Sequence, residues 1–445
     1  MKTFSIGGIH PHDHKISACK PIEPLPIPAV AYISMAQHIG APAQPVVQKG
    51  DYVKVGQLIG KSSGFISANI HSSVSGTVKS VEPVKNGTGS RSMAVIIEVQ
   101  GDEWIDGIDR TPDIHANIAL DAPQIVQKIA DCGVVGLGGA TFPTHVKLSP
   151  PPEKRATCLI LNGAECEPFL TSDHRMMLER GEEVLVGAQI MMKALNVPKG
   201  YIGIEENKPD AIKHLKELSR SFSEIEVVSL KKRYPQGGEK QLIDAVIKRQ
   251  VPSMGLPIDV GAVVQNIGTA LAVYEAVQKN KPLFEQTVTV TGHNLKELRN
   301  FRVRVGTPLA HLIEAVGGVP QEAAKIVLGG PMMGPPVAHL EAPLLKGNSG
   351  VLFLSEQETK RHAETPCIRC AKCVEVCPMG LEPYLLHKLG LFNRTDELEQ
   401  NRVYDCMECG CCMYGCPACV PLLDTIRLSK GQVIKIMRSR PKDSK

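Results

Sequence analysis

Eight cysteines near the C-terminal end constrain this chain more than any other feature. They form two copies of one spacing, C-x2-C-x2-C-x3-C, and each copy is followed directly by proline. The spacing is that of the bacterial iron–sulfur run, in which three thiolates hold one [4Fe–4S] cluster and the fourth ligates the other cluster. The two copies therefore predict an electron-transfer protein with two [4Fe–4S] clusters.

The spacing also predicts which cysteines share a cluster. Three closely spaced thiolates wrap one cluster, and the chain then turns away at the proline, so that the fourth thiolate reaches the partner motif. We expect one cluster to be held by Cys367, Cys370, Cys373 and Cys416. We expect the other to be held by Cys406, Cys409, Cys412 and Cys377. Structural zinc is the main alternative, but zinc sites use two C-x2-C pairs, and these runs do not divide that way.

The remaining composition excludes several classes of function. Ten of the 14 cysteines lie between Cys367 and Cys419, which indicates metal binding in a reducing compartment and not a disulfide framework. Cys411 and Cys419 fall outside the spacing, and we expect both to pack as small apolar residues. A net charge of +4 and 4% aromatic residues argue against a nucleic-acid partner.

The N-terminal segment carries no targeting signal that we can identify. No apolar stretch approaches the ~18 residues of a spanning helix, and MKTFSIGGIH lacks the apolar core of a signal peptide. The first 30 residues are rich in proline and histidine, which predicts an extended strap. His10, His12 and His14 could bind a metal, although alternate histidines in such an arm are more often solvated.

Residues 42–82 alternate apolar and polar side chains between glycine turns, which predicts a small β-sandwich. The segment resembles a biotinyl/lipoyl-type domain. Such domains carry their cofactor on a lysine in a hairpin, and counting back eleven residues from Gly76 gives Phe65 at that place. We therefore expect a scaffold that carries neither biotin nor lipoate.

The middle of the chain alternates longer helical and strand patterns, which predicts a parallel α/β sheet. Helices are expected at 122–132, 173–195, 210–219, 239–248 and 270–278, and strands at 157–161, 201–204, 224–230 and 263–264. A β-β-α-β order over 286–340 then suggests a ubiquitin-like β-grasp module.

The fold class is therefore multidomain α/β with a C-terminal α-helical two-cluster domain. The expected boundaries are a strap at 1–30, a lipoyl-like sandwich at 31–110, a Rossmann-like nucleotide domain at 111–285, a β-grasp module at 286–345, a cluster domain at 346–430 and a basic tail at 431–445.

A glycine-rich loop, GVVGLGGATFPTHVKL, is a candidate for binding a phosphate or a flat ring. Gly136, Gly138 and Gly139 would let backbone N–H groups approach a ligand closely, and Lys147 could add positive charge. The loop follows a predicted helix and not a strand, so it lacks the context of a Rossmann fingerprint. An ordinary turn remains an alternative.

Polar residues follow the next predicted strand. Asn162, Glu165 and Glu167 stand at its C-terminal end, where open α/β sheets bind ligands and where carboxylates can hydrogen-bond a ribose. The alternative is that the two glutamates only cap the following helix. A further Gly-Gly-Glu turn, at Gly238 and Glu239, precedes a later helix.

Together with the cysteine runs, these segments resemble the C subunit of the Rnf complex, the bacterial ion-translocating ferredoxin:NAD+ oxidoreductase. The α/β part is also similar to the NADH-binding flavoprotein subunit of respiratory complex I. The resemblance implies FMN with NAD(H) stacked on it, and places Phe142 near the nicotinamide. The residues that match its motifs are Gly136, Gly138, Gly139, Phe142, Lys147, Asn162, Glu165, Glu167, Gly238, Glu239, Asn266 and Thr269.

Within the same motifs, four other positions differ from the complex I pattern. Leu137 replaces the loop arginine, Ala164 an aspartate, Lys240 the second glutamate of the turn, and Gly268 the glutamate before Thr269. Each change removes a polar contact of that pattern, so flavin binding is expected to be looser.

The resemblance implies a peripheral subunit on the cytoplasmic face of the bacterial membrane. Its partners would be the integral and peripheral subunits of the complex, including an iron–sulfur subunit that receives electrons from ferredoxin. Electrons would pass through the two clusters and FMN to or from NAD(H), and no side chain need act as acid or base. The alternatives are a soluble NADH-dependent iron–sulfur flavoprotein of the hydrogenase type, and a pure relay or assembly protein without a nucleotide site.

Overall fold

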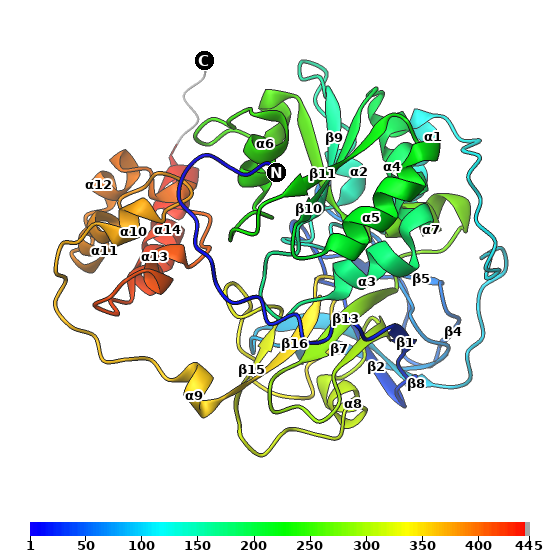
Figure 1. Cartoon of the computed structure of the whole chain (residues 1–445). Helices are drawn as coiled ribbons and strands as arrows, with labels where there is room; N and C mark the ends of the chain where they lie inside the picture. Colours follow the sequence, from blue (N-terminus) through cyan, green and yellow to red (C-terminus); the bar gives the residue numbers. More distant parts are fainter. Residues whose placement is uncertain (441–445) are drawn as a thin grey trace.

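The computed structural model describes residues 1–440. Figure 1 shows a large body of sheets and helices, and a smaller helical lobe at the left that contains the C-terminal cysteines. The N-terminal strap, in dark blue, runs between the lobe and the body before it joins the body near β13 and β16. No helix among the described residues is both long and apolar enough to cross a bilayer.

The expected small β-sandwich is present. One sheet has the order β2-β8-β7-β4 and a second the order β3-β5-β6, and Ile33, Ile59 and Ile97 are fully buried between them. Phe65 lies in the loop after β5 and is 78% exposed. The strands are β2 (Val30–Ser34), β3 (Gln44–Pro45), β4 (Tyr52–Val53), β5 (Leu58–Lys61), β6 (Ile70–His71), β7 (Gly76–Lys85) and β8 (Arg91–Val99).

The middle of the chain forms the expected parallel sheet, in the order β11-β10-β9-β12. Because β10 and β12 flank β9 on opposite sides, the strand order reverses beside β9, and this reversal marks the place where such sheets bind ligands. The strands are β9 (Cys158–Gly163), β10 (Gly200–Glu205), β11 (Ile225–Leu230) and β12 (Ala262–Asn266). The helices are α1 (Ala122–Asp131), α2 (Thr144–Lys147), α3 (Ser172–Glu179), α4 (Gly181–Leu195), α5 (Pro209–Leu218), α6 (Glu239–Ile247) and α7 (Ile267–Gln278).

The single helix expected at 173–195 is wrong, because the structure has two helices there. Arg180 leaves the helical conformation with φ −131° and ψ 28°. Its guanidinium pairs with Glu183 and Glu275. Gly181 follows, where an added Cβ would lie 2.9 Å from a side-chain atom of Leu218. The break lets the second helix pack closely on α5.

A five-stranded sheet, in the order β1-β14-β13-β16-β15, joins the N-terminal strap to the segment that precedes the C-terminal lobe. The expected β-β-α-β elements are present, but the strap adds an edge strand, so it is not extended coil throughout. β16, which pairs with both β13 and β15, lies beyond the expected boundary at residue 345. The elements are β1 (Ile22–Pro24), β13 (Glu285–Thr291), β14 (Arg299–Arg304), α8 (Leu309–Glu314), β15 (Ala323–Leu328) and β16 (Gly350–Ser355).

The C-terminal lobe is helical, as expected, with a core that includes Leu386, Leu398 and Ile426. The expected basic tail from residue 431 is wrong in part, since α14 continues through it to Ser439, and residues 441–445 lie outside the described part. The helices of the lobe are α10 (Lys372–Glu375), α11 (Pro383–Leu391), α12 (Thr395–Gln400), α13 (Cys411–Tyr414) and α14 (Leu422–Ser439), whereas the short helix α9 (Glu356–Thr359) packs against β15 and β16 of the body (Figure 1). Three single 3-10 turns lie at Ser219–Ser221, Pro257–Val260 and Val403–Asp405.

A buried lysine ties the sandwich to the start of the glycine loop. The Lys346 ammonium donates to the carbonyl of Gly133 at 2.8 Å and to that of Asn69 at 3.2 Å. Burial lowers the pKa of Lys346 to about 7. The loop that would carry a cofactor in a lipoyl domain is thus docked against the α/β sheet.

Candidate cofactor sites

The glycine loop meets the carboxyl end of β12 at the reversal of strand order. The N–H of Leu137 donates to Thr269 Oγ1 at 2.9 Å. A Cβ on Gly138 would lie 2.5 Å from Nδ2 of Asn266, so only glycine lets the loop approach this closely. A Cβ on Gly139 would meet no atom within 4 Å, so this side of the loop is open.

The glycine loop folds back on itself through a main-chain hydrogen bond, and an ion pair follows it in the sequence. The N–H of Gly136 donates to the carbonyl of Phe142 at 2.9 Å, which folds the segment back like a hairpin. Lys147, one turn later in α2, donates to Glu239 Oε1 at 2.6 Å and to the carbonyl of Val264 at 2.7 Å. The structure therefore brings the loop, the α6 turn and β12 to one edge.

The carboxyl end of β9 completes this edge. Asn162 Nδ2 donates to the carbonyl of Gly237 at 2.8 Å, which links β9 to the Gly-Gly-Glu turn. A Cβ on Gly238 would lie 2.7 Å from the methyl carbon of Met407 in the C-terminal lobe. The turn thus lies between the candidate flavin edge and the cysteine-rich lobe.

The two glutamates after β9 have different environments. Glu165 caps α3, accepting from the N–H of Asp173 at 2.7 Å and of His174 at 3.3 Å, so the capping alternative holds for this residue. Glu167 instead accepts from the N–H of Met332 at 3.0 Å. Its Oε1 is buried without a hydrogen-bond partner, and burial raises the pKa of Glu167 to about 7. A buried, unpaired carboxyl oxygen can accept from a ligand hydroxyl.

A cavity lies beside the glycine loop, between α3, α7 and the five-stranded sheet. Two of the four departures from the complex I pattern, Leu137 and Gly268, line it. A Cβ on Gly268 would lie 3.5 Å from Leu137, so these positions face each other. The cavity's Arg180 and Asp173 are already bound, to Glu275 and Asn266 respectively.

Four cysteines of the C-terminal lobe line one apolar cavity. We call them the inner set: Cys377, Cys406, Cys409 and Cys412. They come from both motifs, in the combination expected for one of the two clusters. Burial raises the pKa of Cys406 to about 11 and that of Cys412 to about 12, so their thiolates need the positive charge of a bound metal. The donor set, four cysteines from both motifs, suits an iron–sulfur cluster.

Cys411 does not line this cavity. It is fully buried, and its thiol faces the carbonyl oxygen of Tyr234 at 3.9 Å. Hydrogen bonding to Cys409 and burial raise the pKa of the Cys411 thiol. This geometry fits a packing role for Cys411, as the spacing predicts.

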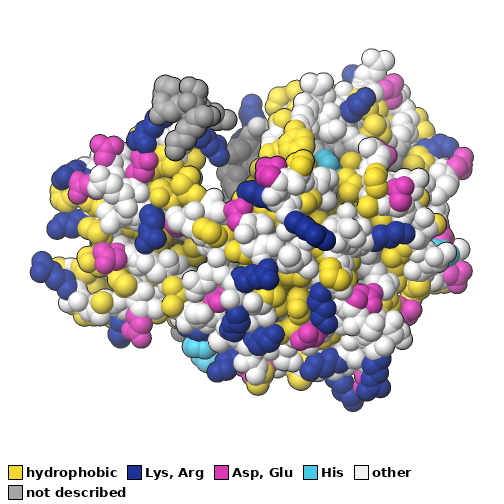
Figure 2. All heavy atoms as spheres, turned by 90° about the horizontal axis from the view of Figure 1, so that it is seen from above, with side chains coloured by type: hydrophobic (Ala, Val, Ile, Leu, Met, Phe, Trp, Pro, Cys, Tyr) yellow, Lys and Arg dark blue, Asp and Glu magenta, His cyan; other side chains and the backbone are white. Residues whose placement is uncertain are grey.

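The other four cysteines, which we call the outer set, are more open: Cys367, Cys370, Cys373 and Cys416. Cys367 and Cys370 are exposed, whereas Cys373 and Cys416 are half-buried. The main chain near this set is held by the N–H of Thr365, which donates to the carbonyl of Ala418 at 3.0 Å. The outer set therefore lies on the surface of the lobe, which forms the left part of Figure 2.

The inner set contacts the rest of the molecule closely. Tyr234 OH donates to the carbonyl of Cys409 at 2.9 Å. Gln241 Nε2 in α6 donates to the carbonyl of Pro378 at 3.0 Å. From the strap, the N–H of Gly8 donates to the carbonyl of Val376 at 2.9 Å. Tyr234 was not predicted as a site residue, although it stands only three residues before Gly237 of the Gly-Gly-Glu turn.

Two histidines of the strap lie near each other, and the third lies apart. The ring centroids of His12 and His14 are 5.8 Å apart, and the His14 ring stacks on Phe169 with 4.7 Å between centroids. His10 Nδ1 instead lies 3.1 Å from the carbonyl of Lys232. Among residues 1–440, no group of three His, Cys, Asp or Glu side chains is arranged around a single metal ion. His14 instead packs the strap against the loop that follows β9.

Comparison with known proteins gives matches along most of the chain. Residues 2–102 match the RnfC barrel sandwich hybrid domain and residues 129–275 the Nuo51 FMN-binding domain. Residues 287–336 match the SLBB domain and residues 359–417 a 4Fe-4S dicluster domain. The chain is 48% identical over 392 residues to the C subunit of the proton-translocating ferredoxin:NAD(+) oxidoreductase complex of Clostridium ljungdahlii, covering 88% of this chain and 85% of that protein.

The chain belongs to the RnfC family. A second RnfC relative is the C subunit of the Na(+)-translocating complex of Acetobacterium woodii, which is 43% identical and matches 96% of each chain. Among solved structures, an NAD+-reducing [NiFe]-hydrogenase aligns with a TM-score of 0.50 at 17% identity, over 73% of this chain and 64% of that one. This likeness confirms the fold of the RnfC body alone.

Proposed function

We propose that this chain is the peripheral electron-transfer subunit of a membrane-bound ferredoxin:NAD+ oxidoreductase. Electrons pass through two [4Fe–4S] clusters and FMN to or from NAD(H), and partner membrane subunits couple this flow to ion translocation. The proposal is supported by family membership and by the matches to FMN-binding and 4Fe-4S dicluster domains.

One structural observation carries the proposal. The Tyr234–Glu239 turn touches both candidate sites, because Tyr234 binds the main chain of Cys409 while Glu239 pairs with Lys147 beside the glycine loop. FMN, when bound, converts between the single electrons of clusters and the hydride of nicotinamide. The turn therefore connects the candidate cluster site, which would hold a one-electron carrier, to the candidate flavin site, where the two-electron exchange with nicotinamide would occur.

The residues at the sheet edge have separable tasks in this proposal. Gly138 lets the loop lie flat against Asn266, and Gly139 leaves space for a ring. Lys147 supplies positive charge for a phosphate, and an ion pair with Glu239 fixes the position of its ammonium group. Phe142 and Glu167 are proposed to contact the nicotinamide nucleotide. These side chains would exclude water from the site and orient the bound nucleotide.

Two further features belong to the proposal. The sheet that contains β13, β14 and β15, with α8 across it, is a ubiquitin-like β-grasp module, as the strand order β14-β13-β16-β15 and the SLBB match support. The protein binds the cytoplasmic face of the membrane complex, next to an iron–sulfur subunit that receives electrons from ferredoxin.

Anaerobic purification followed by optical and EPR spectroscopy, with and without NADH, tests this function. We expect released FMN on denaturation, flavin bleaching by NADH and two [4Fe–4S] signals. Glu167→Ala should slow flavin reduction and leave both clusters intact, whereas Glu82→Ala, an exposed carboxylate in β7, should change nothing. Absence of flavin would favour a pure relay. If no integral membrane subunit copurifies with the protein, a soluble NADH-dependent iron–sulfur flavoprotein would be favoured.

A further inference from the structure

The loop between β9 and α3 is held in an unusual conformation. Glu165 and Phe169 both have positive φ angles, of 43° and 71°, which non-glycine residues rarely adopt. Such conformations persist only where the surroundings enforce them, and they concentrate at functional sites. The loop, residues 164–171, contains both glutamates of the candidate nucleotide site.

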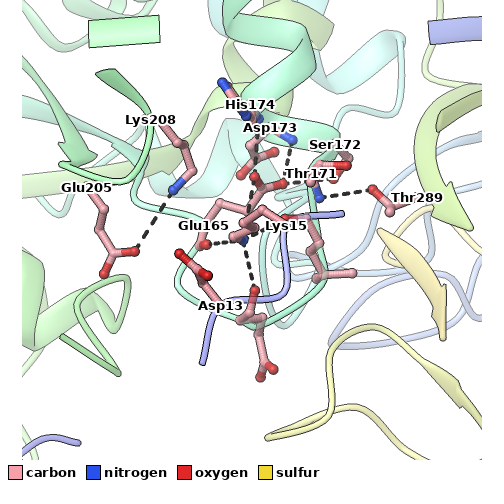
Figure 3. Close-up of polar contacts among 12 residues, drawn as sticks. Asp13, Lys15, Glu165, Thr171, Ser172, Asp173, His174, Glu205, Lys208 and Thr289 are labelled. Atoms are coloured by element: carbon pink, nitrogen blue, oxygen red, sulfur yellow. Dashed lines mark hydrogen bonds and ion pairs between the residues drawn. The ribbon is translucent and has the colours of Figure 1, made fainter. Parts of the chain in front are cut away.

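Two lysine ammonium groups hold the loop in this conformation, and they come from segments that are distant in sequence. Lys15 Nζ, in the strap, donates to the carbonyls of Glu165 at 2.8 Å, Glu167 at 2.9 Å and Leu170 at 2.5 Å. Lys208 Nζ, at the start of α5, donates to the carbonyl of Ala164 at 2.7 Å. The loop is thus wrapped around internal cations, with Lys15 in the centre of the group shown in Figure 3.

The strap reaches this position through contacts on either side of Lys15. The carbonyl of Asp13 accepts from the N–H of Phe169 at 2.8 Å. Two residues after Lys15, Ser17 Oγ lies 2.7 Å from Thr171 Oγ1. These contacts flank the loop, so Lys15 is fixed in place and not merely attracted to a carboxylate.

The buried titratable groups around the loop are mainly acidic. Glu165, Glu167, Asp173 and Glu205 lie in or against it, and burial raises the pKa of the last three. Lys15 Nζ lies 3.9 Å from Glu165 Oε2, and Lys208 Nζ lies 3.9 Å from Glu205 Oε2. Loss of Lys15 would leave three carbonyls without their donor and Glu165 without its nearest ammonium group.

We propose that Lys15 is a positioning residue for the nicotinamide nucleotide. It holds the 164–171 loop so that Glu167 stays at the sheet edge and Glu165 stays on the N-terminus of α3. This inference rests on the proposed function, because it assigns NAD(H) to that edge. Lys15 contacts neither the glycine loop nor any cysteine of the two sets, so flavin and cluster content do not depend on it.

The test compares Lys15→Met with Lys20→Met, which removes a lysine of the same strap whose side chain is exposed. Both variants are purified anaerobically, and NADH oxidation is measured with ferricyanide as an acceptor at the flavin. For Lys15→Met we expect the NADH KM to rise about ten-fold, since hydrogen bonds from a charged donor are lost, while kcat changes less than about two-fold. Hydrogen exchange in a peptide spanning 164–171 should also accelerate.

Lys15→Gln provides a second variant in case the methionine protein does not fold, because it keeps a neutral donor and should raise KM by a smaller factor. The inference is overturned if KM stays at the wild-type value in both Lys15 variants, if Lys20→Met raises it equally, or if FMN is lost instead. If wild-type flavin is not reduced by NADH at all, the proposed function fails, and the exchange data still report whether Lys15 orders the loop.

Discussion

Three cysteines of the inner set and three of the outer set share the spacing C-x2-C-x2-C, but the two sets have different surroundings. The inner set lines an apolar cavity and contacts the body of the molecule through Tyr234 and the strap. The outer set includes two exposed cysteines and lies on the surface of the lobe. We therefore expect the inner set to exchange electrons within the chain, and the outer set to exchange them with a partner at the surface.

The difference arises from packing around identical local motifs. Ile368, between two cysteines of the outer set, is 67% exposed, whereas Met407, at the equivalent place in the inner set, packs against Gly238 of the body. Because burial and nearby charge tune the potential of a cluster, two sites with one motif need not have equal potentials. The following predictions test this contrast.

Removing one cysteine should have the largest effect. Cys377→Ala takes a thiolate from the inner cavity although its sequence neighbours belong to the outer set, so it should damage the cluster held by Cys406, Cys409 and Cys412. We expect loss of about half the iron and of one EPR signal, because each cluster has four cysteine ligands. Cys411→Ser should keep both clusters. Loss of the outer signal alone in Cys377→Ala would contradict the shared wiring.

Iron loss should distinguish the two sets in the unmodified protein. During slow oxidation with a chelator present, the outer cluster should disappear several-fold faster, because solvent and oxidant reach exposed ligands first. Time-resolved EPR on samples reduced again after each interval measures the two signals separately. Equal rates would mean that the inner cavity opens as readily as the surface.

Charge near each set should act more strongly where solvent is excluded. Lys430 Nζ donates to the carbonyl of Cys406 at 2.7 Å and is largely covered, whereas Lys372 lies beside Cys373 on the lobe surface. Lys430→Met should lower the potential of the inner cluster on the order of tens of millivolts. Lys372→Met should shift the outer cluster less, because water and salt screen it. Redox titration followed by EPR measures both, and a larger shift from Lys372→Met would reverse the contrast.

The smallest effect concerns the contact between lobe and body. Tyr234→Phe removes the hydroxyl that donates to the carbonyl of Cys409 and should weaken the contact by about 1 kcal/mol. We expect faster hydrogen exchange near residues 406–412 with both clusters still present. Tyr404→Phe, a tyrosine within the lobe, is the control and should leave that exchange unchanged.

Local patterns were enough to identify much of this protein. Cysteine spacing predicted the inner set's four residues as partners, because cluster ligation depends on short-range chain geometry. Alternation of apolar and polar residues predicted the small sandwich, since periodicity reports which face is buried, and the alternation of strands with helices predicted the parallel sheet. Gly138 was predicted to let the backbone approach a ligand, and the structure shows that it lets the loop approach the side chain of Asn266.

Other predictions needed contacts that no local pattern contains. The helix expected at 173–195 is interrupted because Gly181 must pack against α5, a contact distant in sequence. Glu165 was expected at the nucleotide, yet its carboxylate accepts from the first N–H groups of α3. β16 was assigned to the cluster domain because its pairing with β13 and β15 is non-local.

The sequence by itself pointed to iron–sulfur clusters and FMN and predicted the residues that would hold them, because these predictions follow from residue types and their spacing. Only the tertiary structure decided which cysteine set is buried and that Lys15 of the strap binds a loop some 150 residues away in sequence. Burial and main-chain hydrogen bonds between distant segments depend on how the domains pack, and neither leaves a periodic trace in the chain.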